Sequence, residues 1–417
     1  MAIKGGDLIH VGNLILIDRA QTAGPGQVNI PTEKVYELGN YYSIAQIRDI
    51  PDLSFSLESL DVSAEFESLL CDADYEAMAD GTMLQLQNSK PIDVASEFKA
   101  GFAAGDPERY NVVGSVATPF LVLESVSYRF GVSDKATQQA TLRGDSVYYN
   151  PGSAFIEETD GSGTAGQIVT LAHAAYPYNG DAVAGARYVL SVSLSNGKRL
   201  SFGSDYTENV TGTGAARAVT VTIAKAVPAG TRIRVIYSSD TVATYPQVSH
   251  AAVSATRPAA IKGRDIEVYV GGTALGDRWT SVQSVNIDYR VTLDKDLEFG
   301  NAQVVSQDFD VPEVSGSIDL KPRDYAELYD KVARIAGLQT RTEVAGALSS
   351  VALSLMVVLH SPLADAQGKY PVLKTLYIPD ARFTLPGFTG QVQQKMTVTM
   401  NFDSDTGDLR VYKGAKP

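Results

Sequence analysis

Hydrophobic and polar residues alternate along several short stretches, which is the pattern of a β-strand with one buried face and one wet face. Residues 53–58 alternate in this way, and residues 397–402 do so again late in the chain. The most apolar run, Val351–Leu359, is about half as long as a membrane span and predicts a buried strand. Only Ser63–Met83 and Pro322–Ile335 place apolar residues near helical spacing. The chain is therefore predicted to be mainly β with short helices.

Part of the sequence recurs about 260 residues later. Residues 37–58 match residues 298–319 without a gap, and 8 of these 22 positions are identical, including Pro51 with Pro312. Ala-Ile-Lys-Gly-x-Asp occurs at 2–7 and again at 260–265. A helix-like segment follows each copy, and Tyr128-Arg129-Phe130 resembles Ala381-Arg382-Phe383. We interpret the chain as two copies of one β-sandwich or barrel-type domain, at 1–150 and 259–417.

The segment between the copies, 151–258, is rich in small residues and threonine. Strand patterns occur at Tyr188–Leu194, Arg199–Phe202, Ala218–Ile223 and Arg232–Ser238, with turn residues such as Asn196-Gly197 between them. Short strands at this spacing predict a β-sandwich inserted between the two copies.

The charge is unevenly distributed along the chain. The net charge of −13 divides into −11 for residues 1–150, +1 for 151–258 and −3 for 259–417. Such acidity argues against a protein that grips nucleic-acid phosphates. The single cysteine, Cys71, excludes an internal disulfide and fits a reducing compartment, and residues 1–7 do not resemble a signal peptide.

Candidate catalytic and ligand-binding motifs are weak. The four histidines lack partners at metal-ligand spacing, and Cys71 lies beside acidic residues that disfavour a thiolate. Residues 161–166 match G-x-G-x-x-G without the strand and helix that a dinucleotide site needs, so they indicate a linker. Residues 403–408 resemble a calcium loop but lack its closing glutamate, which favours a turn. We predict no metal, no cofactor and no enzymatic activity.

The order of elements resembles the tail-tube fold of bacteriophages and related injection machines. An N-terminal strand, a long hairpin, a polar β-run, one helix and returning strands occur in both copies. The resemblance implies a major tail protein with two tube domains and an inserted immunoglobulin-like module. Six tube domains close a ring in that family, so three chains would form a pseudo-hexameric ring, and rings would stack into the tail tube of the virion.

The same resemblance implies partners and a location. The chain would be made in the host cytoplasm and assemble with itself. It would also contact the tape measure, terminator and distal tail proteins. DNA would meet it only in transit, and no membrane is involved. The insert is expected to be dispensable for polymerisation.

Two sets of residues are expected to serve such a tube. An acidic lumen would repel phosphate, and its candidate residues are Glu33, Glu37, Asp288, Asp294 and Asp296. These five could instead lie at ring contacts or on the outer surface. A flexible loop to the adjacent ring is expected at Thr22, Ala23, Gly24, Pro25, Gly26 and Gln27, which could equally be an ordinary surface hairpin.

Three other functions remain open. The chain could form the inner tube of a contractile tail or injection system, which has the same fold. It could be a β-sandwich surface adhesin that binds glycans, although the insert lacks tryptophan and aromatic clusters. It could also be an enzyme with a dispersed site.

Overall fold

The structure is a computed structural model, and it is mainly β with antiparallel sheets. It describes residues 4–11, 15–16, 20–36, 45–48, 50–103, 106–150, 152–177, 186–213, 217–239, 260–271, 277–296, 303–323, 327, 352–384 and 397–417. Among these residues, no helix has both the length and the apolar character needed to cross a membrane.

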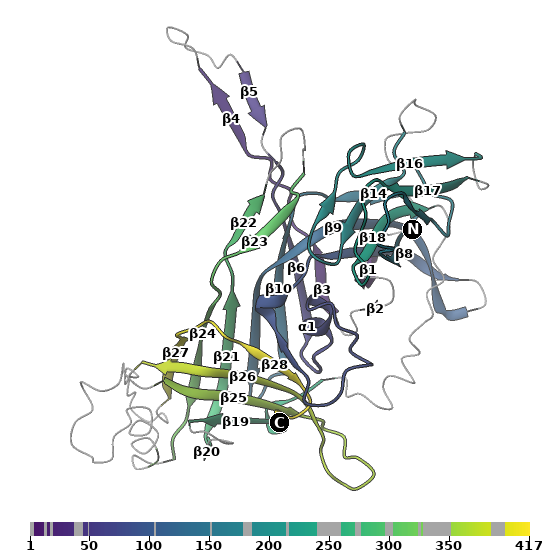
Figure 1. The fold of residues 1–417 in the computed structure, drawn as a ribbon. Helices are drawn as coiled ribbons and strands as arrows, with labels where there is room; N and C mark the ends of the chain where they lie inside the picture. Colours follow the sequence, from purple (N-terminus) through teal and green to yellow (C-terminus); the bar gives the residue numbers. More distant parts are fainter. Residues whose placement is uncertain are drawn as a thin grey trace.

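Six strands of the first half pair in a fixed order within the large sheet (Figure 1). The order is β1 (Lys4–Val11), β8 (Ile92–Ala103), β9 (Asp106–Gly131), β10 (Thr137–Gly144), β6 (Leu53–Leu60) and β3 (Ala20–Pro25). Three smaller strands accompany them: β2 (Ile15–Leu16) beside β1, β11 (Tyr148–Asn150) beside β9, and β7 (Met83–Gln85) farther along the chain. The alternating residues 53–57 lie in β6, whose apolar side chains are buried, as predicted.

The second half repeats this strand order. It runs β19 (Ile266–Val270), β25 (Ala352–His360), β26 (Val372–Phe383), β27 (Val398–Ser404), β24 (Glu313–Leu320) and β21 (Val282–Arg290). The short strands β20 (Asp277–Arg278) and β28 (Arg410–Lys413) pair with β19 and β26, as β2 and β11 pair with β1 and β9. The predicted buried strand at Val351–Leu359 is β25.

The strand registers of the two halves also correspond. The hairpin of β4 (Thr32–Val35) and β5 (Ala45–Arg48) has the register of β22 (Leu293–Asp296) and β23 (Ser306–Phe309), with the spacing that separates Glu37 from Glu298. The β3–β6 ladder shifts register between Ala20 and Thr22, and the β21–β24 ladder shifts between Val282 and Ser284. Pro51 and Pro312 both lie just before the strand that follows.

One sequence match does not mark equivalent positions. Arg129 pairs with Thr137 near the turn between β9 and β10, whereas Arg382 pairs with Asp403 near the far end of β27. The similarity of Tyr128–Phe130 to Ala381–Phe383 therefore reflects the shared alternation of two strands and not a common place in the fold.

Helix is scarcer than the sequence predicts. The predicted helix Ser63–Met83 contains only α1 (Glu65–Leu70), followed by turns and by β7 from Met83. Asp72 has a positive φ of 55°, a left-handed conformation that ends the helix. Short 3₁₀ turns occur at η1 (Leu86–Asn88) and η3 (Gly263–Asp265). Glu327 is helical, while most of Pro322–Ile335 lies outside the described residues.

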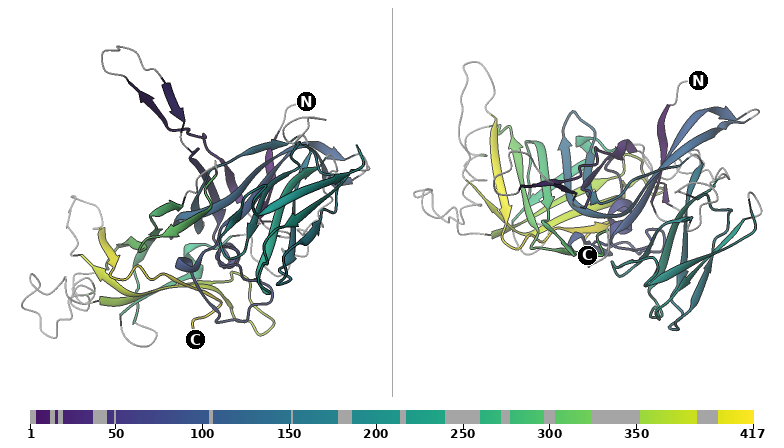
Figure 2. Two further views of the ribbon diagram at one scale, coloured as in Figure 1. Left: turned by 45° about the horizontal axis from the view of Figure 1, so that its top comes forward. Right: turned by 90° about the horizontal axis from the view of Figure 1, so that it is seen from above.

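The segment between the halves folds into two antiparallel sheets around its own apolar cluster (Figure 2). One sheet orders β12 (Ser153–Asp160), β18 (Arg232–Ser239), β14 (Val189–Leu194) and β15 (Arg199–Leu200). The other orders β13 (Gln167–Thr170), β17 (Ala218–Ile223) and β16 (Tyr206–Thr211). The four strands predicted here are present, although the second is shorter than predicted.

The two halves share one sheet and one core. Strand β21 pairs on one side with β24 and on the other with β9 of the first half, from Ser284 opposite Gly131 to Arg290 opposite Ser125. One apolar cluster includes residues of both halves, such as Tyr128, Ile287 and Phe402. The ladder between β9 and β21 therefore joins the halves into a continuous sheet.

A pair of glycines tests this packing. A Cβ at Gly316 would overlap the carbonyl oxygen of Asn286 and the ring of Phe402, whereas a Cβ at Gly24 meets nothing within 4 Å. We expect Gly316→Ala to lower the free energy of unfolding by about 1–3 kcal/mol, the usual cost of overpacking. Gly24→Ala, measured by the same urea denaturation, should change it little. Equal effects of both substitutions would contradict the described contact between β21 and β24.

Candidate functional site: the polar face of the continuous sheet

One face of the continuous sheet is polar across six neighbouring strands. Successive side chains in a strand point to opposite faces, so the residues opposite the core form rows. From β6 to β27 these rows are Ser54, Ser56 and Glu58; Gln139, Thr141 and Arg143; Ser125, Ser127 and Arg129; Ser284, Asn286, Asp288 and Arg290; Glu313, Ser315, Ser317 and Asp319; and Thr399, Asn401 and Asp403. We call this surface the polar face.

Hydroxyl and amide groups dominate the polar face, and they bond to the carboxylates among them. Asp319 accepts hydrogen bonds from Ser284 and Thr399, and Glu58 accepts one from Thr22 on β3. The Asn286 amide donates to the hydroxyl of Ser317 at 3.2 Å. The face therefore presents satisfied, mostly uncharged groups.

Several charges on this face are compensated locally. Arg129 of the first half pairs with Asp288 of the second half at 2.8 Å, across the β9–β21 ladder. Arg143 pairs with Glu124 at 2.9 Å and with Asp52 at 3.0 Å, and these contacts raise the pKa of its guanidinium. Because these arginines are matched by carboxylates, they offer little free positive charge to an anion.

The five residues predicted to line an acidic lumen separate into two groups. Asp288 lies on the polar face, where Arg129 neutralises it. Glu33 lies on β4, and Asp294 and Asp296 lie on β22; all three are exposed. Glu37 lies outside the described residues. The two hairpins extend beyond the end of the sheet in Figure 1, so the polar-face row and the hairpin carboxylates occupy different places.

The predicted flexible loop is a strand for most of its length. Thr22, Ala23, Gly24 and Pro25 belong to β3 and pair with β6, which corrects the prediction of a loop there. Gly26 donates its backbone N–H to Ser54 at 2.7 Å, and Gln27 follows without regular structure. The alternation of Leu53, Phe55 and Leu57 explains this, because that strand needs a partner on each edge.

A buried ionic cluster links the two halves beneath the sheet. Lys374 of β26 reaches Asp61 at 2.8 Å and Glu67 of α1 at 2.7 Å, and all three side chains are fully buried. Tyr128 and Gln138 donate hydrogen bonds to the same oxygen of Glu67. Burial raises the pKa of Asp61 to about 6, although Lys374 lowers it. No sequence motif indicated this cluster, because its members come from distant segments.

A second buried pair fixes the insert to both halves. Arg199 of β15 contacts both carboxylate oxygens of Asp145 at 2.8 and 2.7 Å. Asp145 also accepts the backbone N–H of Val304, and Val305 accepts that of Arg199. The insert is further held by Arg234, which reaches Asp72 at 2.6 Å. Its removal would leave Asp145 buried without its cation.

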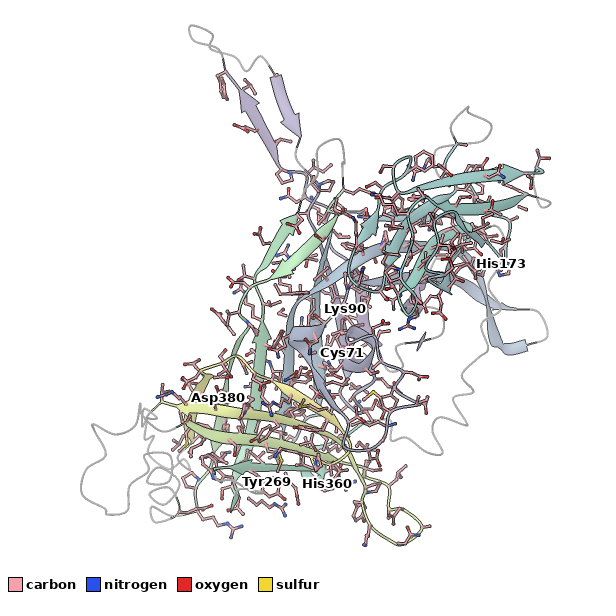
Figure 3. The ribbon with its side chains drawn as sticks, in the orientation of Figure 1. Cys71, Lys90, His173, Tyr269, His360 and Asp380 are labelled. Atoms are coloured by element: carbon pink, nitrogen blue, oxygen red, sulfur yellow. The ribbon has the colours of Figure 1, made fainter. Side chains whose placement is uncertain are left out.

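The groups that suggest catalysis are dispersed. Cys71, His173 and His360 lie in three parts of the molecule (Figure 3). Burial raises the pKa of the Cys71 thiol to about 11, which keeps it protonated. Burial would also raise the pKa of Glu267, but Tyr269, Arg278 and His360 together lower it, so this carboxylate is a stable ion and a poor base. The described residues contain no group of three or more potential metal ligands.

Comparison with known proteins adds no relative. No protein-family model matches the chain, and no curated protein matches it.

The Asp61 carboxyl gives a testable pH dependence. Its pKa is higher in the folded chain than its ordinary value of 3.8, so the folded state binds the extra proton. This contribution to stability is complete below about pH 4 and is lost as the pH rises toward 6. We expect the free energy of unfolding of the wild type, relative to Asp61→Asn, to decrease over this interval in denaturant titrations. A flat difference would show that Asp61 titrates normally.

The Arg199–Asp145 pair gives a second test. Removal of one partner of a buried ion pair usually costs about 3–5 kcal/mol. We expect Arg199→Met to lower the free energy of unfolding by this amount, and Arg199→Met with Asp145→Asn to recover part of it. Lys225→Met is the control, because the Lys225 side chain is 75% exposed where it pairs with Asp205. A double variant as unstable as the sum of its single variants would contradict the coupling.

Proposed function

We propose that this chain is a structural protein that forms the tail tube of a long-tailed bacteriophage. Three chains would close a pseudo-hexameric ring of six tube domains, and stacked rings would form the conduit for DNA. In this proposal each half of the chain is a tube domain, the segment 151–258 is an immunoglobulin-like module, and the protein has no enzymatic activity.

The β9–β21 ladder is the observation that carries the proposal. It joins two sets of strands with the same order and corresponding registers into one sheet. A ladder that connects one repeat to the next can connect further repeats in the same way. Sheets closed in this manner leave no open edge.

The first half retains the edge that such a connection needs. In the described part of the chain, β3 pairs with β6 alone, whereas its counterpart β21 pairs with both β24 and β9. The N–H of Gly26 points toward β6, so strand alternation directs the N–H of Ala23 away from β6. This outer edge of β3 would accept the second half of another chain.

The polar face supports a conduit that does not retain DNA. A wall with unpaired lysines and arginines would bind phosphates and release counterions. Arg129 and Arg143 are neutralised by neighbouring carboxylates, and serine, threonine and asparagine occupy most other positions. We therefore assign passage of DNA to compensated charge and hydroxyl groups, with Asp288 as the lumen residue among those expected from the sequence.

The two hairpins fit contacts between rings. The β4–β5 hairpin extends farthest from the sheet in Figure 1, and its exposed side chains include Glu33 and Lys34. The role first expected for Thr22–Gln27 passes to this hairpin, because β3 is committed to the sheet. Other tail proteins would meet the tube at its ends.

The test is electron microscopy of the purified protein together with a variant of the open edge. Wild-type protein should form rings or tubes with an axial hole. Ala23→Pro removes an N–H from the outer edge of β3 and should prevent rings, while the monomer keeps its β-sheet signal in circular dichroism.

Ala23→Ser is the matched control and should assemble as the wild type does. A wild-type chain that stays monomeric at high concentration would reject the tube. Rings that form with Ala23→Pro would reject closure through β3. A contractile sheath around such tubes in micrographs of the assembled particle would indicate the inner tube of a contractile machine.

A further inference from the structure

The repeated segment Ala-Ile-Lys-Gly-x-Asp has a defined contact in its second occurrence. Ile261 is fully buried in the common core, and its carbonyl accepts the backbone N–H of Ala136 at 2.9 Å. Lys262 forms a β-bridge with Lys135. The segment 260–265 of the second half is thus bound to the turn that precedes β10 in the first half.

Two positions within this segment differ sharply in the space around them. A Cβ at Gly263 would overlap Val132 and lie 2.8 Å from the carbonyl oxygen of Gly131, so only glycine fits there. The next residue, Arg264, has a side chain that is 77% exposed. Asp265 closes the turn by accepting the N–H of Lys262 at 3.2 Å.

The first occurrence has the same residues at the same distance from a strand. The regular ladder begins directly after the aspartate in both halves, with Leu8 opposite Glu97 and Ile266 opposite Leu359. The β1–β8 ladder shifts register between Lys4 and Leu8. The glycines at 5 and 6 therefore lie outside the regular pairing with β8, and they correspond to Gly263 and Arg264.

We propose that the N-terminal segment 2–7 is a docking element for a second copy of this chain. It binds the second half of that copy next to the start of β27, as segment 260–265 binds next to the start of β10 within the chain. No half precedes the first half in its own chain, so the equivalent surface can come only from another copy. This inference rests on the proposed ring, and it adds a contact that is independent of the β3 edge.

The decisive comparison is between two adjacent glycines. Gly5→Ala places a Cβ where its counterpart Gly263 has no room, so rings should be lost or their dissociation constant raised at least tenfold. Gly6→Ala is the matched control, because its counterpart carries the exposed arginine, and it should assemble normally. Sedimentation velocity measures assembly, and thermal melting of the monomer measures the fold.

Within the chain, Gly263→Ala should lower the melting temperature of the monomer, while Gly5→Ala should leave it unchanged. Rings formed by Gly5→Ala as readily as by the wild type would overturn the docking element and leave the tube intact. A lowered monomer melting temperature for Gly5→Ala would place Gly5 in its own fold and also overturn it. A wild type that never assembles would instead reject the proposed function.

Discussion

The ladder between β9 and β21 is the contact on which the rest of the structure depends. It pairs the edge of one half with the long central strand of the other, from Gly131 to Ser125. Without it, β21 would expose a row of unpaired backbone groups and the shared core would be opened to water. The polar face is continuous only because this ladder keeps the two halves in register. Arg129 can neutralise Asp288 for the same reason.

Buried charges accompany this contact and restrict how the parts can be arranged. Lys374 brings a cation from the second half to two carboxylates of the first, and Arg199 does the same from the insert to Asp145. Buried pairs of this kind add little net stability compared with apolar packing, but a misplaced partner is costly. They therefore favour one arrangement of the two halves and the insert over sliding alternatives.

Compensation of charge, and not acidity, distinguishes the polar face. The net charge of the chain suggested a wall of carboxylates, yet Asp288 is paired and the other described candidates lie on projecting hairpins. A surface of hydroxyls and matched ions has weak attraction for phosphate and also avoids the mutual repulsion of like charges around a closed channel. The excess acidic residues serve solubility and contacts at other surfaces.

The sequence by itself determined the β character, the alternating strands and the correspondence between 37–58 and 298–319, because these depend on local periodicity. Leu53, Phe55 and Leu57 bury one face of β6 as their spacing indicates. Tertiary structure decided the rest. Thr22–Pro25 became a strand because β6 required a partner, and α1 ended early at Asp72. Lys374, Asp61 and Glu67 met because pairing across the sheet joins segments about 300 residues apart. No local pattern records such contacts.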